Sequence, residues 1–314
     1  MKSTKNFRTI MVTILMILAG LNISAFKVTQ AEVVDNRLKI GTGLPSAVYS
    51  QMTKTLIQLR PDLIVETGKT SGGIDNMMML LRREADVGIM QADVIEFMRR
   101  TDPMITKKVR SLVGLHTNYL HAFVLRGGLQ VKKNFFQSET VKITDIRQLT
   151  GKSVAAFSSA PVTLRLLNER LGLRLRIIEV GSKDEGLEKL RKGEVWAFFA
   201  TGGKYVSWME KLDGNVYTLA NMRQEDIQRM QAPYFPGKVT YRNLGVVGVN
   251  VLAVRNEMVC WNFTGPRSAQ LLDLQQYIRD HLNDIQEMQG SNPAWQEIEP
   301  QTLDDVSWQM YTGR

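Results

Sequence analysis

A short apolar run, a tight turn and an amphipathic stretch follow one another repeatedly through this sequence, and this alternation constrains the fold more than any other feature. The first cycle begins at Arg37–Ile40, turns at Gly41–Ser46 and continues as a predicted helix to Leu59. Two further cycles begin at Leu63–Glu66 and Val87–Met90. Strands that alternate with helices in this way form α/β structures with parallel strands, because each helix returns the chain to the end of the sheet at which the previous strand began.

A second series of the same kind occupies the middle of the chain, after an apolar strand predicted over Leu120–Leu125. Its predicted strands and helices alternate in this order: Ser153–Phe157, Val162–Leu171, Arg176–Val180, Asp184–Lys192, Trp196–Ala200 and Tyr205–Leu212. A long apolar strand over Gly245–Val254 and an amphipathic helix over Ser268–Met288 follow. The two series predict two α/β lobes.

The N-terminus has the pattern of an export signal. Three basic residues within the first eight positions precede an apolar run over Ile10–Leu21, and Thr29–Ala31 offers a cleavage site. Because a bilayer-spanning helix needs about 20 apolar residues, we expect residues 1–31 to be a cleaved signal peptide. An uncleaved N-terminal anchor is the alternative.

The formal net charge of +9 depends partly on this segment. Lys2, Lys5, Arg8 and Lys27 would leave with the signal peptide and no acid would, so +5 remains. The basic clusters of the remainder are pairs without interleaved aromatic residues, so nucleic acid is not an expected partner. A mild positive field favours an anionic solute. The single cysteine, Cys260, cannot form an intrachain disulfide. Export without disulfides fits a bacterial periplasm or another extracytoplasmic location better than a eukaryotic secretory route.

Two phosphate-binding motifs are incomplete. Gly41–Ser46 half-matches the dinucleotide fingerprint, but its third glycine is replaced by serine and a proline interrupts the turn. Gly151–Ser153 resembles the end of a phosphate loop, but the glycine required five residues earlier is Ile146. We therefore expect no nucleotide cofactor.

The three histidines do not form a recognisable metal site. His116, His121 and His281 lack a second cysteine or a carboxylate cluster that would complete one, so we interpret them as structural or surface residues. No paired acid and base and no activated nucleophile occurs at a recognisable spacing. The sequence thus predicts neither a metal nor an enzyme.

The turn Thr70–Gly73 is a stronger signal for a binding site. Its glycines let the backbone approach a ligand, and a helix is predicted to follow from Ile74. The free N–H groups and partial positive charge of a helix start favour a carboxylate or phosphate. We expect Ser71 and Asn76 to add side-chain hydrogen bonds to such a ligand, whereas a plain helix cap is the alternative interpretation.

Several segments, taken in order, resemble the TAXI family of extracytoplasmic solute-binding proteins that serve TRAP-type transporters. The matching segments are Ile40–Gly43 with Ser46 and Tyr49, Thr70–Gly73 with Asn76, Glu84–Asp93, Leu120–Arg126, Leu149–Ala155, Lys192–Phe199, and Gly203 with Lys204. The sequence also departs from the family pattern. Ala47 and Val48 replace a glycine and a tyrosine, Ser158–Pro161 replaces a glycine-rich turn, and Trp196 replaces an aspartate.

The resemblance implies a type II periplasmic-binding-protein fold with two lobes, a hinge of two crossovers, and a ligand cleft at the carboxyl ends of the strands. Lobe one would hold residues 33–127 and 245–314, and lobe two residues 128–244. The ligand-binding residues implied are Gly43, Ser46, Tyr49, Thr70, Ser71, Gly72, Gly73, Asn76, Gln91, Asp93, Ser158, Ser159, Thr163 and Gly203.

The resemblance also implies a function. The protein would capture an acidic amino acid or related carboxylate, close on it, and present it to the membrane subunits of a TRAP-type secondary transporter. The altered second-lobe turn favours a different function, an orphan binding module that signals or binds proteins without transport. An enzyme that uses the same cleft is a third hypothesis.

Overall fold

In the computed structural model, which describes residues 35–68, 70–133, 137–204 and 206–313, ten strands form one mixed sheet. Eight of these strands follow the order β2-β1-β3-β12-β4-β9-β7-β8, while β10 pairs with β4 and β11 with β12. From Arg37 onward the chain forms a single unit. The predicted signal peptide, residues 1–31, lies outside the described residues.

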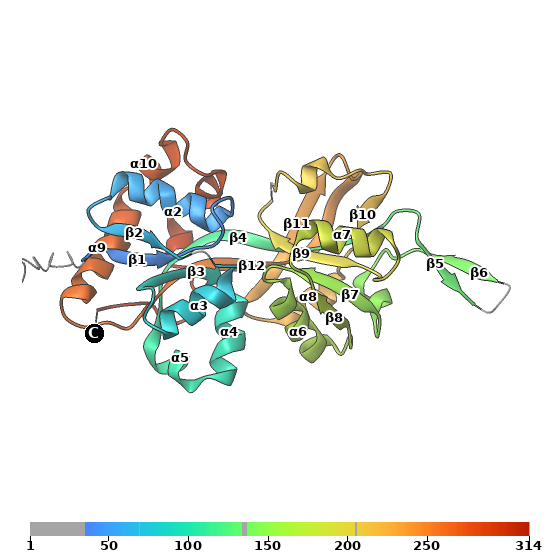
Figure 1. Ribbon diagram of the computed structural model, residues 1–314, viewed down its shortest axis with the longest axis horizontal. Coiled ribbons are helices and arrows are strands. Elements are labelled where there is room, and N and C mark those ends of the chain that lie inside the picture. The colour runs from blue at the N-terminus through green and yellow to red at the C-terminus, as the bar shows by residue number, and fades with distance from the viewer. Residues whose placement is uncertain (1–34, 69, 134–136, 205, 314) are drawn as a thin grey trace, which may run out of the picture. The chain divides into compact units, whose positions relative to one another are not determined.

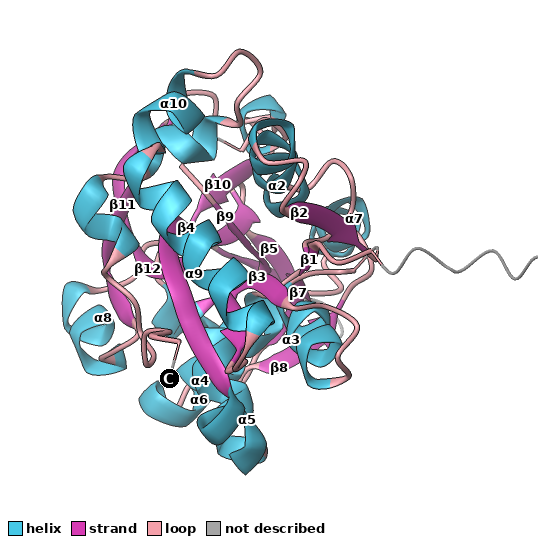
Figure 2. Cartoon of the chain, turned by 90° about the vertical axis from the view of Figure 1, so that its left-hand side faces the viewer, coloured by secondary structure: helices cyan, strands magenta, loops and turns pink. Residues whose placement is uncertain are grey.

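The first part of the sheet is built from the first sequence series. Strand β1 (Leu38–Gly41) lies between β2 (Ile64–Thr67) and β3 (Val87–Gln91) and is parallel to both. We call these strands and the helices around them lobe one. Its helices are α2 (Val48–Leu59), α3 (Gly73–Leu81), α4 (Ala92–Thr101), α5 (Pro103–Lys108), α9 (Pro266–Asp280) and α10 (Leu282–Glu287). Figure 2 shows α2 and α10 on one side of the strands and α4 and α5 on the other.

The second sequence series forms the other part of the sheet, which we call lobe two. Strand β7 (Ser153–Phe157) is parallel to both β8 (Arg176–Glu179) and β9 (Phe198–Gly202). The remaining elements of this lobe are α6 (Ala160–Leu171), α7 (Lys183–Arg191), β10 (Tyr217–Leu219), α8 (Gln224–Met230) and β11 (Tyr234–Tyr241). A hairpin of β5 (Leu129–Lys132) and β6 (Ser138–Val141) projects from it (Figure 1).

Two long antiparallel strands belong to both lobes. They are β4 (Val109–Leu125) and β12 (Val246–Trp261), and Figure 1 shows them running from one group of elements to the other. Residues 256–260 of β12 pair with β3 of lobe one, whereas residues 246–254 pair with β11 of lobe two. The pairing of β4 with β12 shifts register between Arg255 and Glu257, where the chain passes between lobes. These two crossover strands are the hinge strands.

The structure confirms most of the predicted elements and corrects four of them. The predicted helix over Ser268–Met288 breaks at His281, because α10 turns to bury Leu282 and Ile285. In place of the helix predicted to end at Leu212, residues 206–212 form a turn and a single 3-10 turn over Met209–Lys211. The two hinge strands extend well beyond the apolar runs that predicted them.

Packing explains why residues 206–212 form a turn in place of the predicted helix. The indole of Trp208 packs against the rings of Phe123 and Phe198, at centroid distances of 5.6 and 6.4 Å, and the side chain of Met209 is fully buried. A short turn brings both side chains to the same core, which a regular helix at this point does not do. No helix within the described residues is long and apolar enough to cross a bilayer.

Candidate functional site

The N-termini of three helices meet where the two lobes contact each other. Helix α3 begins after Gly72, and a Cβ placed on Gly72 would lie 3.7 Å from the hydroxyl of Ser158 and 3.9 Å from that of Ser159. These serines immediately precede α6 of lobe two. Asp93, in the first turn of α4, contacts Thr163 in the first turn of α6. We call this region the junction. Because helix N-termini carry partial positive charge, the junction favours an anionic group.

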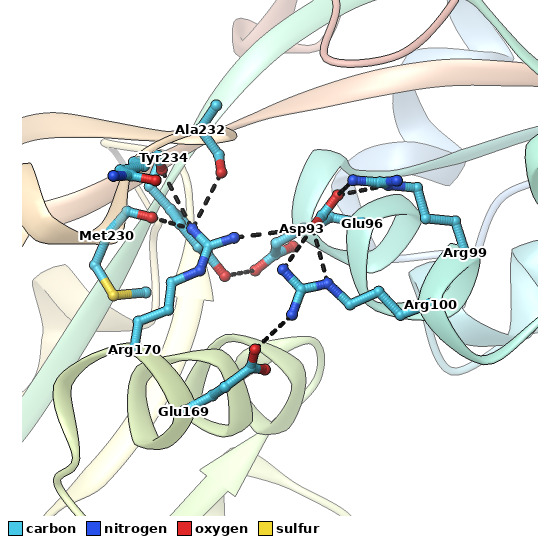
Figure 3. Close-up of polar contacts among 10 residues, drawn as sticks. Asp93, Glu96, Arg99, Arg100, Glu169, Arg170, Met230, Ala232 and Tyr234 are labelled. Carbon is cyan, nitrogen blue, oxygen red and sulfur yellow. Dashed lines mark hydrogen bonds and ion pairs between the residues drawn. The ribbon is translucent and has the colours of Figure 1, made fainter.

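Asp93 is the central side chain of the junction. Its Oδ2 accepts hydrogen bonds from Thr163 Oγ1 at 2.6 Å and from the Tyr234 hydroxyl at 3.0 Å, so both donors come from lobe two (Figure 3). The side chain has no solvent-exposed area, and burial raises the pKa of Asp93 to about 6. Its second oxygen, Oδ1, has no partner among the described residues.

Gln91 lies beside Asp93, at the last position of β3. The side chain is fully buried, and neither Nε2 nor Oε1 has a partner in the described part of the chain. Its neighbour on the adjacent strand is Asn256, which pairs with it in the β3–β12 ladder. A buried amide that satisfies neither its donor nor its acceptor is unusual in a folded protein and requires an explanation.

Asn256 connects the junction to the hinge strands. Its Oδ1 accepts hydrogen bonds from the Tyr49 hydroxyl at 2.5 Å and from Asn118 Nδ2 at 3.2 Å. Its Nδ2 donates to the carbonyl oxygen of His116 at 2.9 Å. Burial and, next, the charge of Asp93 raise the pKa of Tyr49, which places this hydroxyl within the field of Asp93. The hinge strands therefore carry a polar network that borders the junction.

The predicted anion-binding turn Thr70–Gly73 is largely held by its own protein contacts. The amide of Asn76 donates to the carbonyls of Thr42 (2.9 Å) and Ile89 (2.6 Å) and accepts from the Thr70 hydroxyl (2.7 Å). The backbone N–H and the hydroxyl of Ser71 both donate to the carboxylate of Asp75.

Two glycines of this turn have different roles. A Cβ on Gly73 would lie 2.9 Å from that of Met90, so glycine lets α3 pack closely on β3. Gly72 has a φ of +143°, a backbone conformation that residues with a side chain rarely adopt, and it faces the second-lobe serines. Of the predicted turn, the backbone at Gly72 is thus the part nearest lobe two.

Ser158, in the second-lobe turn, has a φ of +61°, the left-handed conformation that glycine adopts most easily. The resemblance indicated a glycine-rich turn at this position, and here a serine adopts a conformation that favours glycine. Ser159 follows at the N-cap of α6 and is buried. The altered turn therefore presents two hydroxyls to Gly72.

The structure places three other predicted residues in different surroundings. Gly43 lies against Ala47, and Ser46 is exposed just before α2. Gly203 lies beside the carboxylate of Glu297 and the carbonyl of Thr117. The predicted residues that the structure brings together at or beside the junction are Tyr49, Gly72, Gln91, Asp93, Ser158, Ser159 and Thr163.

Ion pairs beside Asp93 also join the lobes (Figure 3). Glu96 of α4 binds Arg99 and Arg100, and Arg100 also binds Glu169 of α6 at 2.7 Å. Arg170 of α6 lies 3.9 Å from Glu96 and donates to the Ala232 carbonyl at 3.1 Å. Lobe two thus contacts α4 through both hydroxyls and ion pairs, and these contacts surround the buried Asp93.

Sequence reasoning missed three members of the site: Asn118, Tyr234 and Asn256. Each lies in a strand far along the chain from the motif it serves; Tyr234 is 141 residues from Asp93 and Asn256 is 207 residues from Tyr49. Asn256 stands between Arg255 and Glu257, just after the predicted apolar strand, so the local sequence does not mark it as part of a site. Within the residues that the structure describes, no group of three or more His, Cys, Asp or Glu is placed to hold a metal ion.

The two buried histidines are electrically neutral at physiological pH. Burial lowers the pKa of both His116 and His121 to about 4. His121 Nε2 forms a hydrogen bond of 2.9 Å with the Tyr241 hydroxyl in lobe two, and His116 supplies its backbone carbonyl to Asn256. Neither ring provides a positive charge to Asp93.

Solved structures resemble this topology. A structural-genomics protein from Archaeoglobus fulgidus superposes with a TM-score of 0.50 at 11% sequence identity, over 85% of this chain and 84% of its own. A putative L-cystine ABC transporter protein from Listeria monocytogenes gives a TM-score of 0.49 at 16% identity, over 88% of this chain and 99% of its own. An arginine transport-system periplasmic binding protein from Legionella pneumophila gives 0.45 at 13% identity, over 79% and 94%.

No protein-family model and no curated protein sequence matches the chain. At these identities the structural likeness shows the fold alone. The mixed sheet, the two lobes and the paired crossover strands define the class: this is the two-lobed α/β fold of type II periplasmic binding proteins, as the sequence predicted.

Proposed function

We propose that this protein is an exported solute-binding protein that captures a small carboxylate-bearing solute at the junction. The observation that carries the proposal is the convergence of three helix N-termini around buried polar groups from both lobes. The ordered resemblance to the TAXI family supports delivery to the membrane subunits of a TRAP-type transporter. An acidic amino acid or a related carboxylate fits the same resemblance.

The position of the carboxylate follows from the donors available. In α3, the backbone N–H groups that precede Asn76 have no partner within the helix. At the start of α6, Ala160 supplies such an N–H group, whereas Pro161 has none and Val162 donates to the Ser159 carbonyl. The hydroxyls of Ser158 and Ser159 lie beside Gly72. A carboxylate placed between Gly72 and these serines receives hydrogen bonds from both lobes at once. Such a ligand favours the closed arrangement, because only that arrangement supplies both sets of donors.

Thermal unfolding of the purified protein with a panel of amino acids and carboxylates tests capture. A ligand at 100 times its dissociation constant adds about 2.7 kcal/mol to the free energy of unfolding. If no compound of the panel raises the melting temperature, the capture hypothesis fails, and the protein-binding module without transport becomes the better account.

A charge substitution then tests the location. Ser159→Asp removes no side-chain cap bond, since the Ser159 side chain makes none at the start of α6, and aspartate is well accepted at an N-cap position. The substitution adds a negative charge where the ligand carboxylate is proposed to bind. We expect calorimetric titration to show affinity for the captured solute reduced by more than about tenfold. Ser138→Asp, on the exposed strand β6, is the matched control and should bind normally. Equal affinity for both variants contradicts this location.

A further inference from the structure

The junction contains buried polar atoms that the protein itself leaves without partners. They are Nε2 and Oε1 of Gln91 and Oδ1 of Asp93, on side chains with no exposed area. The two residues flank Ala92, at the point where β3 ends and α4 begins. A buried polar group without a hydrogen bond is destabilising unless something else satisfies it.

Asp93 also forms no ion pair with a described residue, although Arg170 lies in the same cluster, 3.9 Å from Glu96 and 5.7 Å from the ring of Tyr234. Within the described residues, the ion pairs of α4 are made by Glu96, Arg99 and Arg100, and none within 4.0 Å includes Asp93. The groups that face Asp93 are the hydroxyls of Thr163 and Tyr234 and the backbone N–H groups of Asp93 and Val94, with the Tyr49 hydroxyl further away. Hydroxyls and the start of α4 stabilise the carboxylate in part, but they do not neutralise it.

A purely structural role explains only half of the arrangement. An acid in the first turn of a helix is favourable, and the bonds from Thr163 and Tyr234 tie the lobes together. Both bonds, however, end on the same oxygen, Oδ2. The tie therefore gives no function to Oδ1, nor to either polar atom of Gln91.

We propose that an ammonium group of the ligand binds Asp93 Oδ1 and Gln91 Oε1. An ammonium group donates three hydrogen bonds and carries the charge that Asp93 lacks. Gln91 Nε2 then donates to the ligand carboxylate, which the helix starts also attract. The ligand is accordingly zwitterionic, an amino acid rather than a simple dicarboxylate. This inference rests on the proposed capture function and specifies its substrate class.

The test compares matched compounds that differ in one group. L-Glutamate is titrated beside 2-hydroxyglutarate and glutarate, and L-alanine beside lactate, propionate and ethylamine. We expect at least one amino acid to bind about tenfold or more tightly than its hydroxy and deaminated counterparts, the usual effect of a hydrogen bond between charged groups. The ammonium assignment is overturned if a hydroxy or deaminated counterpart binds as tightly as every amino acid tested.

Asp93→Asn is the critical variant, because it keeps the shape of the side chain and removes the charge. In this variant the amino acid should lose its preference over the hydroxy and deaminated counterparts. Asp184→Asn is the matched control: Asp184 is an exposed acid at the same position in the first turn of α7. The preference of the Asp184→Asn variant for the amino acid should equal that of the wild type. An unchanged preference in Asp93→Asn overturns the proposal.

The remaining outcomes separate this inference from the proposed function. If ethylamine binds and propionate does not, the ammonium site stands and the carboxylate part of the proposed function fails. If carboxylates bind equally with and without the amino group, capture stands and the ammonium site fails. If no compound binds to the folded wild-type protein, both fail together.

Discussion

Asn76 offers the sharpest test of the structure against the sequence, because the two predict different results for one substitution. The sequence places its amide on a ligand. In the structure the side chain is fully buried, its Nδ2 donates to the carbonyls of Thr42 and Ile89, and its Oδ1 accepts from Thr70. These three bonds join α3 to the residue after β1, to the middle of β3 and to the turn that precedes the helix.

Asn76→Ala removes all three bonds and leaves two carbonyls and one hydroxyl buried without this partner. A buried hydrogen bond contributes about 1 kcal/mol, and a group left unsatisfied costs about 1–3 kcal/mol. We therefore expect the free energy of unfolding to fall by about 3 kcal/mol, because three bonds are lost together. Thr70→Val, which removes one of the bonds, should cost about 1 kcal/mol.

Urea denaturation of the ligand-free protein measures these changes. Asn283→Ala is the matched control, because Asn283 is exposed in the first turn of α10 and should change stability by less than about 0.5 kcal/mol. The structural reasoning is refuted if Asn76→Ala unfolds like the control while affinity for the captured solute falls by about tenfold. That result would place the amide on the ligand, as the sequence suggested.

Two further predictions concern the contacts between the lobes. Burial raises the pKa of Asp93 to about 6. The folded protein therefore retains a proton on Asp93 that the unfolded chain releases near pH 4. As pH rises from about 4.5 to about 7.5, the free energy of unfolding of the wild type should fall by about 2 kcal/mol relative to that of Asp93→Asn. Denaturation curves at both pH values check this, and a difference between the two proteins that does not change with pH contradicts it. The ion pair of Arg100 and Glu169 is partly exposed, so Arg100→Gln should weaken solute affinity by no more than about fivefold, and the effect should vanish at about 0.5 M salt. A loss that persists in high salt, measured by titration, would show that Arg100 acts by more than exposed charge pairing.

The α/β core was predictable because its local and global signals agree. The strands around Ile40, Val65 and Ala155 are short apolar runs that end in a turn, and each is followed by a helical pattern. The helix from Val48 to Leu59 ends where Pro61 follows, as expected from the restriction that proline places on the residue before it. Such elements depend mainly on residues close by in the sequence.

The hinge strands were underestimated for the opposite reason. Beyond Val254 the chain continues with Arg255, Asn256 and Glu257, three polar residues that indicate the end of a strand. In the structure β12 continues to Trp261, because Asn256 bonds to Tyr49 and Glu257 accepts from Ser111 and Ser307. Partners distant in the sequence satisfy these groups, so no local pattern reveals that the strand continues.

Part of the candidate site was also predictable from the sequence, and part depends on residues distant in the chain. Gln91, Asp93 and Thr163 were predicted from the resemblance, and the structure brings Asp93 and Thr163 into contact. Tyr234 and Asn256 were not predicted, because β11 and the crossover strand β12, both far along the chain from Asp93, supply them. The roles of Ser71 and Asn76 were also hidden, since a turn sequence does not show whether its polar groups face a ligand or one another.

The dependence of lobe one on β12 has a consequence for how the protein is made. β3 has β12 as its neighbour, and the Tyr49 hydroxyl bonds to Asn256, 207 residues later in the chain. A chain that emerges from the ribosome N-terminus first must hold the edge of β3 unpaired until most of the polypeptide has followed, and such edges invite aggregation. Pairing across so long a separation is slow to form. Lobe one therefore becomes complete only after every strand of lobe two has already left the ribosome.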